Sequence, residues 1–185
     1  MENYIIKNNL RKKMLEKRQA LSKKEVLEKS LSINTQLFST PAYQNANSIL
    51  FYAPIQNEVD LSNIACESFN KKIVCFPKIK DEKLALFAIS SLQELKRGRF
   101  NILEPIEKIE IAPEEIDLFL IPGIVFDKEG YRIGYGKGYY DKLLEKNKKI
   151  KMGVCFEFQV KKYIPIEKHD QKMNFLITER GIKEC

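Results

Sequence analysis

Residues 130–141 bring together the groups that protein sites use to hold a phosphate. The segment reads GYRIGYGKGYYD, with glycine at positions 134, 136 and 138. Glycine reaches positive φ angles and lets the backbone approach an anion with no Cβ in the way. Lys137 adds a mobile cation, and Asp141 is a carboxylate of the kind that holds a hydrated Mg²⁺ against phosphate oxygens. The segment therefore predicts an anion site, whose ligand the local pattern leaves open.

The spacing within this segment differs from that of two familiar nucleotide loops. A Walker loop places Ser or Thr directly after its lysine, whereas Lys137 is followed by glycine. The dinucleotide fingerprint G-x-G-x-x-G places its third glycine elsewhere. A plain turn, with Asp141 as a charge at a helix N-terminus, is the structural alternative. It explains one or two of the glycines but not the whole run.

The elements that must position this segment are those of an α/β protein. Short apolar runs predict strands, at 48–53, 72–77, 84–90, 117–122, 151–156 and 174–179. We expect the strand at 84–90 to be antiparallel, at an edge of the sheet. Amphipathic spacing predicts helices at 60–70 and 139–147. This order predicts a three-layer α/β/α sandwich, Rossmann-like, with a mainly parallel sheet and mixed edges.

The glycine segment has a defined place in such a fold. It follows the strand predicted at 117–122 and precedes the helix that begins near Tyr139. Ligands of open α/β sheets bind beyond the carboxyl ends of the strands, where helix N-termini present free N–H groups and a partial positive charge. The predicted position therefore agrees with the predicted binding of an anion.

An N-terminal helical arm, residues 1–40, precedes the first strand. A helix is predicted at 4–20, and the pair Ser22 and Glu25 predicts a capping box at the start of a second helix. We expect residues 1–185 to form a single domain with this arm packed on it.

Two cations on the arm, Lys7 and Arg11, are four residues apart, which places both on one face of the first helix. A pair of solvated charges on a basic helix is the alternative for them. Basic residues concentrate in 1–40 and 128–151, and the formal net charge is +7. Such clustering favours an anionic partner, either nucleic acid or a small molecule with phosphates or carboxylates.

Other features of the composition exclude several classes of protein. No apolar run approaches the ~20 residues that span a bilayer, and the N-terminus lacks the apolar stretch of a signal peptide. We therefore expect a cytoplasmic protein without a membrane partner. The 4 cysteines are scattered without a C-x-x-C pair, and the one histidine is His169. Structural zinc is not expected from this spacing.

The segment FDKEGYRIGYGKGYYDKLL closely resembles the signature of the 5-formyltetrahydrofolate cyclo-ligase family, also called methenyltetrahydrofolate synthetase. Four further segments match in the expected order across nearly the full length: KNNLRKKM, FYAPIQNEVD, IPGIVFD and IPIEKHDQKMNFLITE. The resemblance implies closure of 5-formyltetrahydrofolate to 5,10-methenyltetrahydrofolate with ATP and Mg²⁺. Transfer of the γ-phosphoryl group to the formyl oxygen activates the carbon, the substrate's own N10 attacks, and phosphate leaves. Such a protein positions reactants and stabilises charge, and it needs no nucleophile of its own.

The resemblance also implies a set of site residues. Those expected to bind ATP are Lys7, Asn8, Asn9, Leu10, Arg11, Arg132, Ile133, Gly134, Tyr135, Gly136, Lys137, Gly138, Tyr139 and Tyr140. Those expected to bind the folate are Arg11, Ala53, Glu58, Tyr135, Gly136, Lys137, Gly138 and Tyr139. Asp141 and Asp170 match metal-ligand positions, although Asn174 stands where relatives often have a second acid. Glu58 is expected to accept hydrogen bonds from the pterin.

Several readings stay open beside this one. A nucleic-acid-binding module would also interleave tyrosines with basic residues, but no base-reading motif accompanies them, so nucleic acid is not an expected partner. Another nucleotide-dependent α/β enzyme is a further alternative. The aromatic residues Tyr52, Phe76 and Phe126 suit either the wall of a pterin pocket or the protein core. We expect a monomer whose ligands are a folate and ATP.

Overall fold

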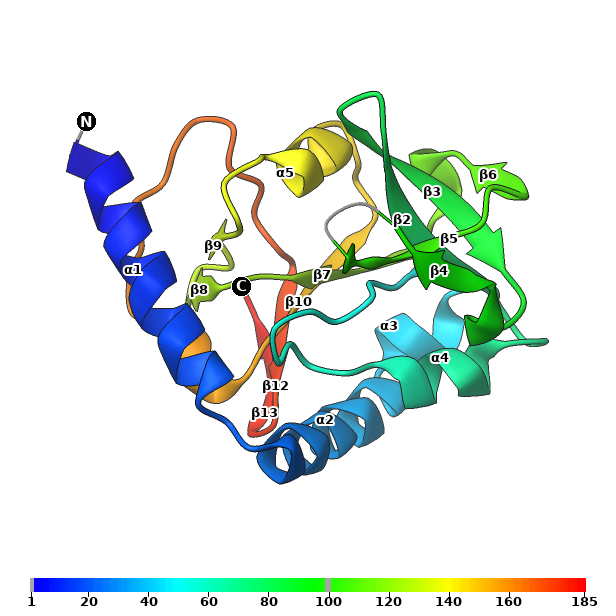
Figure 1. The fold of residues 1–185 in the computed structure, drawn as a ribbon, viewed down its shortest axis with the longest axis horizontal. Helices are drawn as coiled ribbons and strands as arrows, with labels where there is room; N and C mark the ends of the chain where they lie inside the picture. Colours follow the sequence, from blue (N-terminus) through cyan, green and yellow to red (C-terminus); the bar gives the residue numbers. More distant parts are fainter. Residues whose placement is uncertain (1, 99–100) are drawn as a thin grey trace.

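An eight-stranded sheet forms the centre of the computed structural model, which describes residues 2–98 and 101–185 (Figure 1). The strand order is β13-β12-β10-β7-β1-β2-β3-β6. The strands are β1 (Ser48–Leu50), β2 (Ile73–Lys80), β3 (Lys83–Ile89), β6 (Ile109–Ile111), β7 (Leu118–Pro122), β10 (Ile150–Val154), β12 (Phe175–Thr178) and β13 (Gly181–Glu184). The six strands predicted from apolar runs are all present, although β1 is shorter than the run 48–53.

The middle of the sheet is parallel and its edges are antiparallel. Strands β2, β1, β7, β10 and β12 pair in parallel, while β3, β6 and β13 pair antiparallel with their neighbours. The predicted mixed-edge sheet is confirmed, and so is the antiparallel direction of β3. The prediction that β3 is an edge strand is wrong, because β6 covers it. Strand β6 is only three residues long with a glutamate at its centre, which leaves no apolar run to detect.

Helices cover both faces of the sheet, as the three-layer prediction requires (Figure 1). Helices α2 (Lys23–Phe38), α3 (Pro41–Asn45) and α4 (Ser62–Ser68) pack on one face, against strand residues such as Ile49 and Val74. Helix α5 (Tyr139–Leu144) packs on the other face, against residues such as Phe119 and Leu176. The capping box of Ser22 and Glu25 is present at the start of α2.

The first helix of the N-terminal arm packs outside the central sheet. Helix α1 (Glu2–Gln19) packs its residue Met14 against Ile124, Val125 and Ile133. Val125 and Ile133 belong to a small three-stranded sheet, and Ile124 lies directly before it. The order of its strands is β11 (Val160–Lys161), β8 (Val125–Asp127) and β9 (Arg132–Ile133). A separate hairpin pairs β4 (Leu95–Arg97) with β5 (Leu103–Pro105).

Both predicted helices that flank the strands are shorter than expected. The stretch 60–70 forms a helix only over Ser62–Ser68, because the Asp60 carboxylate accepts a hydrogen bond from the Ser62 backbone N–H and sets the turn before it. The stretch 139–147 ends its helix at Leu144, before a run of lysines.

Three aromatic residues left open between core and pocket wall belong to the core. Tyr52, Phe76 and Phe126 are each buried. The Phe126 ring occupies the space that a Cβ would need at Gly123 and Gly153, at distances of 2.5 Å in both cases. The four cysteines are free. Within the described ranges, no helix is both long and apolar enough to cross a membrane.

Candidate active site

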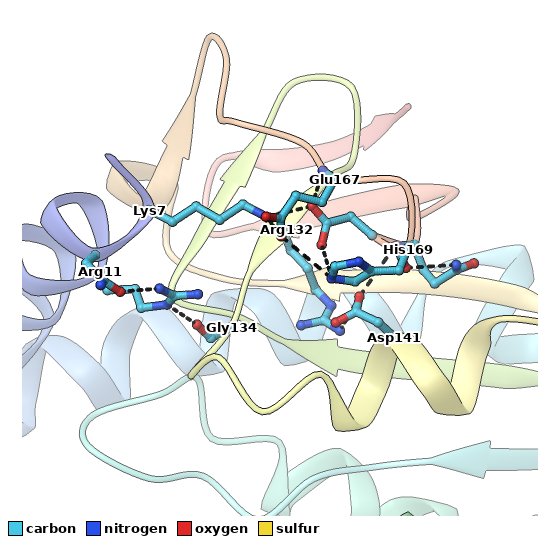
Figure 2. A network of polar contacts seen from close by, with 10 residues as sticks. Lys7, Arg11, Arg132, Gly134, Asp141, Glu167 and His169 are labelled. Carbon is cyan, nitrogen blue, oxygen red and sulfur yellow. Dashed lines mark hydrogen bonds and ion pairs between the residues drawn. The ribbon is translucent and has the colours of Figure 1, made fainter. Parts of the chain in front are cut away.

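One face of α1 points a row of cations at the carboxyl end of the sheet. Lys7, Arg11 and Arg18 are separated by four and seven residues, so all three lie on the same side of the helix. Lys7 is 6% exposed and Arg18 is 1% exposed, although charged residues rarely become so buried without partners. Figure 2 shows Lys7 and Arg11 extending from α1 toward the loops that follow β9 and β11.

The glycine loop, residues 134–138, joins β9 to α5 and meets this row of cations. The Arg11 Nε–H donates to the Gly134 carbonyl at 2.8 Å. Gly136 has φ +92, and a Cβ built on it would lie 3.5 Å from Nη2 of Arg11. Gly138 also has a left-handed φ of +65 at the N-cap of α5. The backbone of the loop thus needs glycine at 136 and 138, and it lies against the Arg11 guanidinium.

Three ion pairs surround the loop. The Lys7 ammonium lies 2.8 Å from an Asp170 oxygen and 2.9 Å from a Glu167 oxygen. Burial lowers the pKa of Lys7, but the hydrogen bonds to Asp170 and Glu167 outweigh it, so the pKa is raised and the ammonium stays charged. Arg132 donates from Nη2 to Asp141 at 3.0 Å (Figure 2).

These groups line one small cavity of about 100 Å³. Its lining residues are Lys7, Arg11, Arg132, Ile133, Gly134, Gly136, Asp141, Glu167, His169 and Asp170. Three cations, three acids and a bare backbone converge there from α1, from the glycine loop and from the segment after β11. No run of neighbouring residues in the sequence could assemble such a set.

The cavity has the donors and acceptors that a phosphate with its metal ion requires. The buried Nε of Arg132 has no hydrogen-bond partner among the described residues, which leaves one N–H for a ligand. Ligand atoms of Glu167, His169 and Asp170 lie within 4.8 Å of one another. Carboxylate oxygens are the ligands that Mg²⁺ prefers. The residues therefore fit an anion held together with a divalent cation.

A second polar cluster lies deeper, where the segment after β1 meets the glycine loop. Glu58 is 5% exposed, and its Oε2 accepts a hydrogen bond from the Ile55 backbone N–H at 3.1 Å. The Tyr135 hydroxyl donates to Oε1 of Glu58 at 3.4 Å, and Nη1 of Arg18 lies 3.5 Å from the same oxygen. Burial raises the pKa of Glu58 to about 7, against the opposing effects of Arg18, the Ile55 N–H and Tyr135.

The structure gathers most of the predicted site residues but gives some of them other surroundings. Lys137 is exposed, and no hydrogen bond or ion pair within the described part of the chain involves its side chain. Asn9 is exposed as well, while Leu10 packs beside the Met14 cluster. Tyr140 packs in the core below α5, with the Arg132 guanidinium 5.5 Å from its ring centroid.

The remaining predicted residues lie near the loop or the sheet edge. Asn8 accepts a hydrogen bond from Arg11, and Ala53 is half-buried just beyond the carboxyl end of β1. Tyr139 is half-buried at the start of α5. Asn174, which raised a question about the metal ligands, does not line the cavity. Its side-chain oxygen accepts from the Lys151 backbone N–H at 2.9 Å, at the amino end of β10.

Sequence reasoning missed three residues of these clusters, namely Arg18, Glu167 and His169. Arg18 continues the helical spacing of Lys7 and Arg11, and that spacing was the signal available for it. Glu167 precedes Asp170 by three residues, and its backbone N–H donates to the Asp170 carboxylate at 2.8 Å. The sequence signal for Glu167 was its position at a turn, three residues before the predicted metal ligand Asp170.

Known proteins resemble this chain over nearly its whole length. A model of the 5-formyltetrahydrofolate cyclo-ligase family matches residues 4–179. A Mus musculus protein of that name is 29% identical over 189 residues, covering 94% of this chain and 93% of its own. A Mycoplasma genitalium protein of the same name is 34% identical over 163 residues, covering 84% of this chain and 87% of its own.

Solved structures agree with these sequence matches. The 5,10-methenyltetrahydrofolate synthetase of Aquifex aeolicus is 37% identical, with a TM-score of 0.89 over 97% of this chain and 92% of that one. The corresponding synthetase from Mycoplasma pneumoniae is 30% identical, with a TM-score of 0.76 over 94% of this chain and 98% of that one. The similarity thus extends over the arm, the sheet and both polar clusters.

Proposed function

Since the chain belongs to the 5-formyltetrahydrofolate cyclo-ligase family, we propose that it closes 5-formyltetrahydrofolate to 5,10-methenyltetrahydrofolate, consuming ATP with Mg²⁺ and releasing ADP and phosphate. The observation that carries this proposal is the convergence of Lys7, Arg11 and Arg132 on the glycine loop, with acids in the same cavity. A site for a polyphosphate and its metal ion needs these groups at one place.

The reaction assigns a task to each group in the cavity. The formyl oxygen attacks the γ-phosphorus of ATP, and the bond from that phosphorus to the bridging oxygen breaks to release ADP. Cations around the loop oppose the negative charge on the transferred group. The unpaired N–H of Arg132 and the guanidinium of Arg11 would contact phosphate oxygens. Asp141 and Asp170 would hold Mg²⁺, which neutralises phosphate charge, with Glu167 close to Asp170.

The second half of the reaction uses a nucleophile of the substrate. N10 of the folate attacks the activated formyl carbon and loses its N–H proton to the phosphate or to water. The carbon–oxygen bond breaks, and inorganic phosphate leaves with the former formyl oxygen. The protein supplies only orientation here, which alone lowers a barrier substantially when reacting atoms are held in contact.

The buried carboxylate of Glu58 is the proposed anchor for the pterin. A carboxylate accepts hydrogen bonds and donates none, so it suits adjacent N–H groups of a flat heterocycle. Tyr135 joins this anchor to the glycine loop. The folate and the γ-phosphate would then meet at the loop, with the Arg11 side chain beside Gly136.

A direct assay tests the proposal. Purified protein is mixed with 5-formyltetrahydrofolate, ATP and Mg²⁺, and the absorbance of methenyltetrahydrofolate is followed over time. We expect product only when all three components are present, with one ADP released for each methenyl product. Matched reactions omit ATP, omit Mg²⁺, or replace the protein with its Gly136→Val variant. Folded wild-type protein that forms no methenyl product would remove the proposal.

Other readings of the basic surface fit the geometry less well. Lys7 and Arg132 turn inward onto acids and do not face a flat surface, so no observation favours nucleic-acid binding. Salt-sensitive RNA binding without folate-dependent ATP hydrolysis would favour that alternative. The cytoplasmic location and the monomeric state stay predictions.

A further inference from the structure

Arg18 is the most thoroughly enclosed charged side chain near the site. It is 1% exposed, and its donors contact three different segments of the chain. Nε donates to the Gln56 carbonyl at 2.9 Å, and Nη1 donates to the Gly123 carbonyl at 3.2 Å. Nη2 donates to the Tyr135 hydroxyl at 2.6 Å. Arg18 therefore joins α1 to the segment after β1, to the turn after β7 and to the glycine loop.

Arg18 and Tyr135 reach the same oxygen of Glu58. Nη1 of Arg18 lies 3.5 Å from Oε1, and the Tyr135 hydroxyl lies 3.4 Å from it. The hydroxyl accepts from Arg18 at a much shorter distance than it donates to Glu58. The Arg18 guanidinium therefore holds the Tyr135 hydroxyl in place more strongly than the Glu58 carboxylate does. A change in the position of Glu58 alters the contacts of both partners.

Tyr135 passes this constraint to the phosphate side of the site. Its two chain neighbours are Gly134, whose carbonyl accepts from Arg11, and Gly136, whose α-carbon faces the Arg11 guanidinium. The side chain of Tyr135 is therefore held on the Glu58 side, while the backbone around it faces the cavity. Neighbouring glycines offer little resistance to movement of the loop. The tyrosine hydroxyl accepts from Arg18 and lies 3.4 Å from side-chain oxygens of both Glu58 and Gln56, so it links the loop to this cluster.

We propose that Arg18 is a positioning residue that couples folate binding to nucleotide binding through Tyr135. This inference rests on the proposed function. A folate bound to Glu58 fixes the carboxylate, which with Arg18 fixes the Tyr135 hydroxyl and hence the glycine loop. A nucleotide that binds next meets a loop that is already ordered and loses less conformational entropy. The coupling is reciprocal, so the nucleotide strengthens folate binding by the same factor.

A purely structural role for Arg18 makes a different prediction. Loss of a structural contact lowers the melting temperature and weakens both ligands, but it leaves unchanged the ratio of nucleotide affinities measured with and without folate. The ratio is therefore the decisive quantity. It can be measured by calorimetry, without turnover, using a non-hydrolysable ATP analogue with Mg²⁺ in the absence and presence of saturating 5-formyltetrahydrofolate.

Four variants complete the experiment. Arg18→Met removes the guanidinium, Arg18→Lys keeps one charge, and Tyr135→Phe removes only the hydroxyl from a partly exposed side chain. Lys17→Met is the matched control, because Lys17 is the exposed neighbour of Arg18 on α1. Wild type and Lys17→Met should bind the analogue about 5- to 150-fold more tightly with folate present. The ratio should fall close to one in Arg18→Met and Tyr135→Phe, and to an intermediate value in Arg18→Lys.

The outcomes separate this inference from the function on which it rests. A ratio of one in the wild type, or a wild-type ratio in Tyr135→Phe, overturns the coupling. Tyr135→Phe keeps the test decisive if Arg18→Met does not fold, because it leaves the guanidinium and the ring in place. A folded wild type that binds the analogue but no folate would instead remove the proposed function.

Discussion

Two polar clusters lie along the same face of α1 and hold their charges in different ways. The outer cluster consists of Lys7, Glu167, His169 and Asp170, and two of its members are well exposed: the side chains of Glu167 and His169 are 44% and 70% accessible. The inner cluster consists of Arg18, Glu58 and Tyr135, and its ion pair is 1% and 5% accessible. Both cations are therefore enclosed, since Lys7 is only 8% accessible, and the two clusters differ in how far water reaches the partners of each cation.

The difference shows what each cluster can do when a ligand arrives. An ion pair that water reaches is held by little net free energy, so Lys7 can exchange the half-exposed Glu167 for a phosphate oxygen at small cost. A buried pair is different, because removing either partner leaves an unsolvated charge. Glu58 and Arg18 must keep their contacts, and a ligand there has to bring complementary N–H groups. The outer cluster thus suits a ligand that binds and dissociates in each turnover, and the inner cluster suits specific recognition of a ligand with complementary N–H groups.

The largest effect is expected from a substitution in the glycine loop, which lies between the two clusters. Gly136→Val should abolish turnover, at least about 100-fold, because a β-branched residue resists φ +92 and its side chain would press on the Arg11 guanidinium. Steady-state rates with a thermal melt measure this. Gly181→Ala is the control: this glycine also has a positive φ, at the β12–β13 turn, with no atom within 4 Å of the added Cβ. Equal activity losses in the two variants would show that loop strain, not the site, is responsible.

Removing cations of the α1 row should have the next largest effect. Lys7→Ala and Arg11→Ala each lose charge-assisted hydrogen bonds worth about 1.5–3 kcal/mol, so affinity for a non-hydrolysable ATP analogue should fall roughly 10- to 150-fold. Calorimetry measures this, and the exposed Lys12→Ala on the same helix is the matched control. Lys7→Ala also leaves Asp170 unpaired, so its melting temperature should drop more than that of Lys12→Ala. Unchanged affinity in both site variants would reduce the row to a solvated basic face.

The two clusters also differ in how far they could be predicted. The glycine loop, Asp141 and the Lys7–Arg11 pair stand out because their residue types and close spacing reflect local geometry. Arg18 did not stand out, because a buried arginine and a solvated one look alike until tertiary contacts choose between them. The long apolar strands were predicted for a similar reason: their burial on both faces leaves a continuous run. Strands of two or three residues, such as β9 and β11, exist only because a neighbour pairs with them.

A change confined to the inner cluster should affect folate and spare ATP. Glu58→Gln keeps the size but replaces an acceptor oxygen by an amide donor, which leaves a pterin N–H poorly paired at a cost of roughly 1–3 kcal/mol. The KM for folate should rise about tenfold or more, while the KM for ATP stays near that of the wild type. Glu67→Gln, in an exposed acid on α4, controls for loss of charge alone. A rise in the KM for ATP instead would reverse our placement of the two ligands.

The contribution of Glu58 to the free energy of unfolding should depend on pH, which gives a second test of the buried cluster. The Glu58 pKa is about 7 in the folded protein, above the ordinary value of 4.5, so the folded state keeps a proton that the unfolded chain has already lost. Its contribution to the free energy of unfolding therefore falls as pH rises from about 4.5 to about 7. Urea denaturation should show Glu58→Gln gaining stability relative to wild type between pH 5 and pH 8. A constant difference would mean that Arg18 keeps Glu58 ionised throughout.

The smallest expected effect concerns Asp141, the proposed metal ligand on the glycine-loop side. Asp141 accepts from Arg132 and lies in the first turn of α5, so a structural role and a metal role are both open to it. Asp141→Asn keeps an acceptor oxygen for Arg132 but loses the charge that attracts Mg²⁺. We expect the variant to bind the ATP analogue and to need several-fold more Mg²⁺ for half-maximal activity.

A comparison with another acid on the same helix separates the two roles of Asp141. The exposed Glu145→Gln, at the C-terminal end of α5, removes a charge with no cavity nearby and should leave the Mg²⁺ requirement unchanged. If Asp141 acts only as a helix N-terminal charge, Asp141→Asn costs about 0.3–1 kcal/mol of stability and its Mg²⁺ titration matches that of wild type. In that case the glycine backbone and the cations would hold the phosphates alone. The exposed Glu167 and the nearly buried Asp170 would then be the remaining acids for the ion, and the outer cluster would carry the whole metal site.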